Sequence, residues 1–169
     1  MNSLFIRRVL AFSIDYMIII IYAVLLFLVS TLLTNNFDVN LNFESPFKNQ
    51  ILGFFSLTLP IFLYFYLSEK SSHNATIGKE VMRLKVIPSN GNIFLRNFLK
   101  FLPWEIAHMG VYQVVFYDQQ QLDMPIWVWG LLIVPQAIVL GYILSVLRLK
   151  GVSSIYDKIS NTRIKLSSK

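Results

Sequence analysis

The sequence predicts an all-α membrane protein with four transmembrane helices and both termini in the cytoplasm. Three observations support this fold class. Hydrophobic residues make up 55% of the 169-residue chain and charged residues only 14%, against about 25% charged in an average soluble protein. Several apolar stretches have the roughly 20 residues that a membrane span needs. The segments between these stretches alternate in net charge. We expect one transmembrane domain over residues 1–169.

The first two predicted spans lie in the N-terminal half of the chain. Residues 9–33 form the first span. This stretch is too long for a signal-peptide core and lacks a small-residue cleavage site before Asn35, so we expect a retained helix. Residues 51–67 form the second span and contain Pro60. Neighbouring helices can satisfy the carbonyl that this proline leaves without a donor.

Residues 101–117 and 126–147 are the third and fourth predicted spans. The fourth stretch carries no charge over 22 residues, although Pro135 interrupts it. The third is less apolar because it contains Glu105 and His108. A helix lying on the membrane surface is the alternative for this stretch. Its length and the charges of the connections favour a span.

The connections between the predicted spans alternate in sign. From the N-terminus to the C-terminus their net charges are +2, −1, +4, −2 and +5. Because Lys and Arg are retained on the cytoplasmic side, the three basic segments belong there. The overall charge of +6 is then explained by topology, aided by attraction to anionic lipid. Nucleic acid is not an expected partner.

The connection between the second and third spans holds local structure. Residues 80–86 alternate polar and apolar side chains, which indicates a short strand or extended segment, and residues 88–92 carry a turn signal. Residues 93–102 place Arg96 and Lys100 on one helical face. This pattern predicts a short amphipathic helix at the membrane surface before the third span.

Three titratable residues lie inside the predicted spans. A carboxylate at bilayer depth costs about 2.5–3.5 kcal/mol, so such residues are usually paired or functional. Asp15 shares one helical stripe with Arg8 and Ala11, and the small Ala11 would let another backbone approach. Glu105 and His108 lie one turn apart near the cytoplasmic end of the third span. All three titratable groups are therefore expected near the cytoplasmic face.

Each of these groups also has a structural interpretation. Asp15 can pair with a basic residue to fix helix packing, Glu105 can face cytoplasmic water, and His108 can be a neutral packing residue. The Glu-x-x-His spacing is half of a metal motif of helical bundles. Because only one copy is present, a metal site would need a second chain or Asp15 as a further ligand. We expect no metal.

An enzymatic function is not expected. The chain has no cysteine, which excludes disulfides, thiolate metal sites and cysteine nucleophiles. No set of nucleophile, base and orienting group is visible. We expect no cofactor.

Four short stretches carry a resemblance to a known family. RRVLAFSID places Arg8 seven residues before Asp15, and it is followed by ATIGKEVMRLKV (75–86), LRN (95–97) and YDKISNTRI (156–164). In this order they resemble the RDD family of small multipass membrane proteins, named for an arginine and two aspartates. The resemblance covers nearly the whole chain.

The resemblance implies a structural polar cluster at the cytoplasmic face. Arg8, Asp15 and Asp157 would be the name-giving residues, and the C-terminal segment can fold back toward Arg8 and Lys79. An arginine between two carboxylates would use its five donors fully. Glu105 and His108 are not part of the family pattern.

Two functions fit this interpretation. Some RDD members are linked to sodium/proton antiport, so the resemblance implies exchange of a monovalent cation for protons across the cell membrane. Asp15, Glu105 and His108 are the candidate ion- or proton-binding residues. Because many transporters pair two repeats, a homodimer is expected. The alternative is a non-transporting assembly or adaptor protein that holds a partner through its cytoplasmic polar face.

Overall fold

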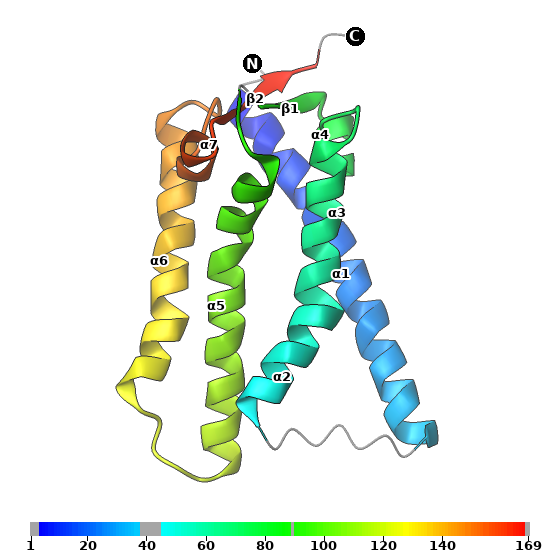
Figure 1. Cartoon of the computed structure of the whole chain (residues 1–169), viewed down its shortest axis with the longest axis vertical. Coiled ribbons are helices and arrows are strands. Elements are labelled where there is room, and N and C mark those ends of the chain that lie inside the picture. The colour runs from blue at the N-terminus through cyan, green and yellow to red at the C-terminus, as the bar shows by residue number, and fades with distance from the viewer. Residues whose placement is uncertain (1–3, 38–44, 89, 168–169) are drawn as a thin grey trace.

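The structure, a computed structural model, describes residues 4–37, 45–88 and 90–167 and shows a bundle of long helices with several short elements at one end (Figure 1). In chain order the elements are α1 (Leu4–Phe37), α2 (Pro46–Gly53), the π-helix η1 (Phe54–Thr58), α3 (Leu59–Lys70), α4 (Ile77–Val81), β1 (Leu84–Pro88), α5 (Ile93–Gln119), α6 (Ile126–Arg148), α7 (Ile155–Ile159) and β2 (Thr162–Leu166). The short elements α4, β1, α7 and β2 lie together at the end of the bundle where α1 begins, and we call them the cap.

Three of the described helical stretches are long and apolar enough to cross a membrane, namely Leu4–Asn36, Pro46–Lys70 and Ile126–Arg148. They contain the predicted spans 9–33, 51–67 and 126–147. The predicted span 101–117 lies inside α5, which packs along α6. Its 27 residues give a length of about 40 Å, against about 30 Å for the hydrocarbon core of a bilayer.

The amphipathic helix predicted over residues 93–102 is not a separate element but forms the first turns of α5. Asn92 begins this helix, because its side chain accepts a hydrogen bond of 3.0 Å from the backbone N–H of Leu95. Contrary to the expectation, Arg96 does not face water, since only 1% of it is exposed. The cap covers this side of the helix, so its polar face meets other polar side chains.

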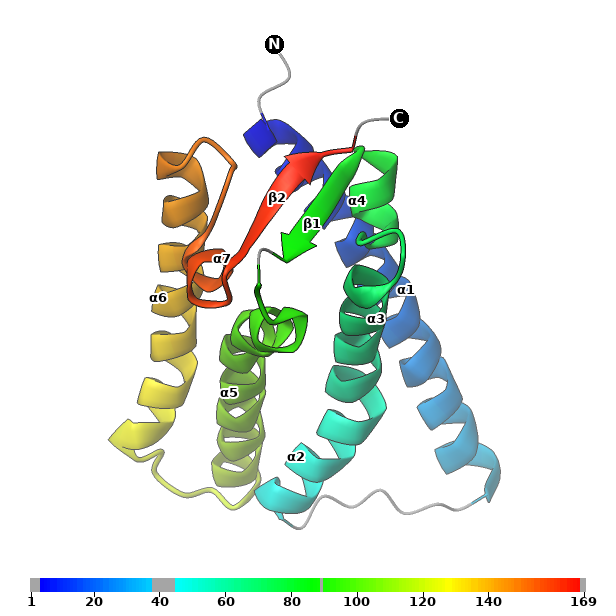
Figure 2. The same cartoon turned by 45° about the horizontal axis from the view of Figure 1, so that its top comes forward.

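A two-stranded antiparallel sheet forms the outer part of the cap (Figure 2). Val86 of β1 lies opposite Ile164 of β2, and both pack with Leu84 against Ala11 of α1 in a small apolar core. The strand expected over residues 80–86 begins later, and β2 was not predicted. The all-α prediction therefore needs this correction, while the long helices dominate the fold.

In the helix that contains Pro60, a neighbouring helix supplies the hydrogen-bond donor that the proline lacks. Proline has no N–H to donate to the preceding turn. The hydroxyl of Tyr22 on α1 donates instead to the carbonyl of Ser56, four residues before Pro60, at 2.5 Å. This contact confirms the expectation that a neighbouring helix supplies the missing donor. The same stretch contains the π-helical turn η1, which ends at the buried Thr58.

A second proline, in α5, is also compensated by a hydroxyl from a neighbouring helix. Pro103 lies inside this helix and cannot donate to the carbonyl of Leu99. The hydroxyl of Tyr142 on α6 donates to that carbonyl at 3.1 Å. The two tyrosines therefore compensate for the two prolines and tie each proline-containing helix to its neighbour.

Tyr142→Phe should lower the free energy of unfolding by about 1–2 kcal/mol, because a carbonyl between packed helices loses its donor. Thermal unfolding of the purified protein measures this change. In a Pro103→Ala background the restored N–H should make Tyr142→Phe nearly neutral. Tyr117→Phe is the matched control, since the ring of Tyr117 makes aromatic contacts but its hydroxyl donates no hydrogen bond among the described residues. Equal effects in both backgrounds would contradict the assignment.

Candidate functional site

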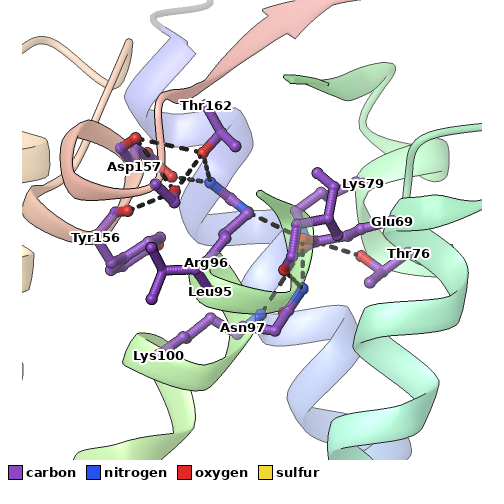
Figure 3. A network of polar contacts seen from close by, with 12 residues as sticks. Glu69, Thr76, Lys79, Leu95, Arg96, Asn97, Lys100, Tyr156, Asp157 and Thr162 are labelled. Atoms are coloured by element: carbon purple, nitrogen blue, oxygen red, sulfur yellow. Dashed lines mark hydrogen bonds and ion pairs between the residues drawn. The ribbon is translucent and has the colours of Figure 1, made fainter. Parts of the chain in front are cut away.

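A buried network of charged and polar side chains lies inside the cap (Figure 3). We call it the cap network, and it consists of Arg8, Asp15, Glu69, Thr76, Lys79, Arg96, Asn97, Asp157 and Thr162. These residues come from both ends of the sequence and from six different elements or the turns beside them. The cap therefore joins the first helix, the middle of the chain and the C-terminal segment in one place.

Arg96 is the centre of the cap network. Its Nε donates to Glu69 at 2.9 Å, and its Nη1 donates to Asp157 and, at 3.1 Å, to the hydroxyl of Thr162. Both carboxylates are fully buried. Buried charges are tolerated only when they are paired and hydrogen-bonded. The arginine thus holds the end of α3 and the start of α7 against α5.

Glu69 binds further donors in the last turn of α3. Lys79 of α4 donates to its Oε1 at 2.7 Å, and the amide of Asn97 donates to its Oε2 at 3.0 Å. The ammonium of Lys100 lies 3.8 Å from Oε1. Three basic residues therefore surround one buried carboxylate, which makes Glu69 the link between α3, α4 and α5.

Asp157 connects the C-terminal segment to the first helix. Its Oδ2 accepts hydrogen bonds from Nη1 and Nη2 of Arg8 at 3.0 and 3.1 Å. The same oxygen accepts the backbone N–H of Ser154 at 2.8 Å, and the Ser154 hydroxyl accepts the N–H of Asp157 in return. This reciprocal pair is a capping box that begins α7. One carboxylate thus both starts a helix and fixes it to α1.

Tyr156 reports the electrostatic character of this region. Its hydroxyl accepts a hydrogen bond of 3.2 Å from Arg8, and the guanidinium of Arg96 lies 5.3 Å from its ring centroid. Burial by itself would raise the pKa of Tyr156, but the positive charges of Arg8 and Arg96, with further contributions from Ser154 and Lys79, outweigh burial, so the pKa lies below its usual value. The surroundings of Tyr156 are therefore positive.

Asp15 is held by neutral donors. The hydroxyl of Thr76 donates to its Oδ2 at 2.6 Å. Its Oδ1 accepts the backbone N–H of Gly78 at 2.9 Å and the hydroxyl of Tyr64 at 3.1 Å. Lys79 donates to the Thr76 hydroxyl at 3.3 Å, which joins Asp15 to the cap network indirectly. Asp15 therefore anchors the start of α4 onto α1.

The stretches that supply these contacts fall within a match to one family model. The model is described as RDD family, and it matches residues 3–161. The chain belongs to the RDD family. No curated protein and no solved structure gives a significant match.

The RDD residues meet in a way that the sequence predicted only in part. Arg8 and Asp157 form a direct ion pair. Among the described residues, Asp15 pairs with neither of them and is connected to the rest of the cap network only through Thr76 and Lys79. The expectation that Arg8 lies between two carboxylates is wrong. Arg96 occupies that position instead, between Glu69 and Asp157.

Two central residues of the RDD cap network were missed or misplaced by sequence reasoning. The sequence pattern indicates only that Glu69 is a charge in a polar connection, and it predicts a solvated helix face for Arg96. A usable signal exists, since Glu69 lies two residues beyond the apolar span 51–67 and the stretch after it holds several basic residues. Their pairing across 27 residues of chain could not be assigned without the fold.

Glu105 of this RDD protein lies in a second polar site. Thr58 donates its hydroxyl to Oε2 of Glu105 at 2.6 Å, and the amide of Gln50 donates to Oε1. Glu105 lies nine residues beyond Arg96 in α5, which is about 13 Å along the helix. Glu105 and Asp15 therefore have separate sets of hydrogen-bond partners.

His108 packs between aromatic rings. Its ring centroid lies 4.9 Å from that of Trp104 and 6.5 Å from that of Tyr112. Its imidazole makes no hydrogen bond within the part of the chain that the structure describes. The same described residues contain no group of three or more acidic or histidine side chains able to hold a metal ion. The structure does not place Asp15 beside Glu105 and His108 as a third ligand.

Proposed function

We propose that this RDD protein is a four-span transporter of the cell membrane that exchanges a monovalent cation for protons, with Glu105 as the ion-binding carboxylate. The observation that carries the proposal is the set of partners around Glu105. Thr58 and Gln50 are neutral, and among the described residues no basic side chain forms an ion pair with Glu105. One negative charge within the helices is then available for either a proton or a metal cation.

The neighbouring oxygens support cation binding at this position. Hard cations such as sodium take carboxylate, amide and hydroxyl oxygens as ligands. The Oε1 atom of Gln50 is buried and accepts no hydrogen bond within the described chain. Thr58 closes the π-helix η1, and π-helical turns occur frequently at functional sites. Glu105, Gln50 and Thr58 therefore offer oxygens from three parts of the bundle.

The other titratable candidates take different places in this proposal. Asp15 accepts three hydrogen bonds from neutral donors and anchors α4, so we assign it to the cap. His108 lies one turn along α5 from Glu105 and stays the candidate for passing protons. The described chain supplies one such carboxylate, so a homodimer with one Glu105 in each copy is our working expectation.

The four-span topology has its own test, because α5 is more polar than the other long helices. We expect α5 to cross the membrane with both termini in the cytoplasm, as the alternating loop charges predict. Ser72 precedes α5, Gln120 follows it, and both are exposed. Single cysteines at these two positions of the cysteine-free chain should label from opposite sides in intact vesicles, Ser72→Cys from the cytoplasmic side. Labelling of both from one side would exclude a crossing by α5.

Transport itself is tested by sodium and pH jumps in liposomes that contain only this protein. Glu105→Gln should reduce cation-dependent proton flux to the level of empty liposomes, because the amide cannot exchange a proton for sodium. The matched control is Glu80→Gln in the cap, where the side chain is 57% exposed and flux should stay unchanged. Exchange by Glu105→Gln at the parental rate would show that Glu105 is not the carrier. Absence of parental flux for Na⁺, Li⁺ and K⁺ would favour the assembly or adaptor alternative.

A further inference from the structure

A small cavity lies inside the cap, beside the cap network. Its volume is about 60 Å³, and its charged lining consists of Arg8, Asp15, Lys79, Arg96 and Lys100. A water molecule needs roughly 10–15 Å³ of this kind of volume. The cavity therefore has room for a few waters or for one small ion.

Two of the lining cations have donors left over. Arg96 is 1% exposed, and its hydrogen bonds to described residues leave from Nε and Nη1 only, so both N–H groups of Nη2 are unused. The ammonium of Lys100 lies 3.8 Å from the nearest carboxylate oxygen, on Glu69, which is beyond hydrogen-bond distance. It lies 3.6 Å from the centroid of the Phe65 ring. The Arg96 side chain is buried, and a buried donor such as its Nη2 normally has an acceptor, whereas 20% of the Lys100 side chain is exposed.

The charges around the cavity are not balanced by the protein. Four basic side chains face it, whereas the described carboxylates in and beside it are Asp15, Glu69 and Asp157. One positive charge is therefore left over whenever Lys100 is protonated. Asp15 does line the cavity, but both of its oxygens already accept hydrogen bonds from Thr76, Gly78 and Tyr64. This excess makes the cavity unsuitable for a metal cation.

We propose that this cavity binds a small anion, either chloride or a single phosphate group, between the Nη2 of Arg96 and the ammonium of Lys100. The anion would supply the acceptor that these donors lack and would neutralise the excess charge. Charge-assisted hydrogen bonds of this type are shorter and stronger than neutral ones. The site is separate from Glu105, so the inference does not depend on cation transport.

Anion binding at this site should be coupled to protons. Burial lowers the pKa of Lys100 well below its usual value, while Glu69 and Asp15 act in the opposite direction and Lys79 and Arg96 add to the lowering. Tyr156 of α7 is a further titratable group that lines the cavity. A bound anion favours the protonated lysine. Binding should therefore take up protons and become tighter as the pH falls.

The first experiment uses the full chain in nanodiscs of zwitterionic phosphatidylcholine. Sodium gluconate is replaced at constant ionic strength by chloride or inorganic phosphate, and the unfolding temperature and binding heat are recorded. We expect a saturable rise in the unfolding temperature, which a ligand specific for the folded state produces. Lys100→Gln should weaken the affinity at least tenfold, and Lys100→Arg should retain it. Lys70→Gln is the matched control, since Lys70 donates to Tyr66 outside the cavity.

A second set of nanodiscs distinguishes a free anion from a lipid headgroup. If a headgroup phosphate fills the cavity, phosphatidic acid should raise the unfolding temperature and abolish the response to free phosphate. The proposal is overturned if chloride, phosphate and gluconate give equal effects on the parent, a comparison that needs no variant to fold. Equal affinities of Lys100→Gln and Lys70→Gln would overturn it too. Glu105→Gln should bind the anion normally, so failure of transport and failure of this site are distinguishable.

Discussion

Replacing Arg96 by methionine should lower the free energy of unfolding by about 3–5 kcal/mol, the range for removing one partner of a buried ion pair. The side chain is 1% exposed and bridges Glu69 and Asp157. Without it, Glu69 Oε2 keeps only the amide of Asn97. The Oδ1 of Asp157 loses its guanidinium donor in the described structure. The cost comes from the two carboxylates left in a buried place rather than from the lost volume.

Denaturant or thermal unfolding of the purified protein in detergent measures this effect. Arg163→Met is the matched control, because Arg163 lies exposed on β2 and its loss should change stability by less than about 0.5 kcal/mol. Arg96→Lys should be intermediate, since a lysine keeps the charge but cannot bridge two carboxylates with a planar fork. If Arg96→Met and Arg163→Met unfold alike, Arg96 does not hold the cap together.

Gly78→Ala should destabilise the protein by about 3 kcal/mol, at the upper end for adding a methyl group to a packed site. A Cβ atom at Gly78 would lie 2.1 Å from the carbonyl oxygen of Ala11 and 2.9 Å from the carboxyl carbon of Asp15. Because the nearest atom belongs to backbone, it cannot turn away. Either α4 moves off α1 or Asp15 loses the N–H of Gly78 that it accepts.

Gly141→Ala is the matched control, and it should change the free energy of unfolding in the opposite direction. Gly141 lies in α6, and a Cβ atom there meets no other atom within 4 Å. Alanine should raise the free energy of unfolding by about 0.5–1 kcal/mol through its higher helix propensity. The difference between the two variants isolates the close approach of α4 to α1. A neutral Gly78→Ala variant would contradict this packing.

The long helices could be predicted because their signal is local. A run of apolar residues has to be about 20 residues long to cross a bilayer, and the chain satisfies this requirement segment by segment. The small Ala11 was likewise identified as a place where another backbone could approach, and Gly78 lies there. Strand β2 carries no comparable signal, because its pairing with β1 depends on segments far apart in the chain.

The polar sites were harder to predict because the partners of a buried charge leave no periodic pattern. A helix face with Arg96 and Lys100 gives the same amphipathic spacing whether it meets water or a buried carboxylate. Glu105 was identified as a residue of interest, but its partners Gln50 and Thr58 lie 55 and 47 residues away. Arg8 and Asp157 were paired through the family resemblance, since 149 residues separate them.

The ion pair between Arg8 and Asp157 can form only after nearly the whole chain has been translated. Translation releases α1 long before α7, so Arg8 and Arg96 have no access to Asp157 until every long helix of the bundle has been synthesised. During that interval Arg96 can already pair with Glu69, but Arg8 lacks its carboxylate partner and is left to contact water or acidic headgroups. This ion pair of Arg8 in the cap therefore cannot form before α7 has been synthesised.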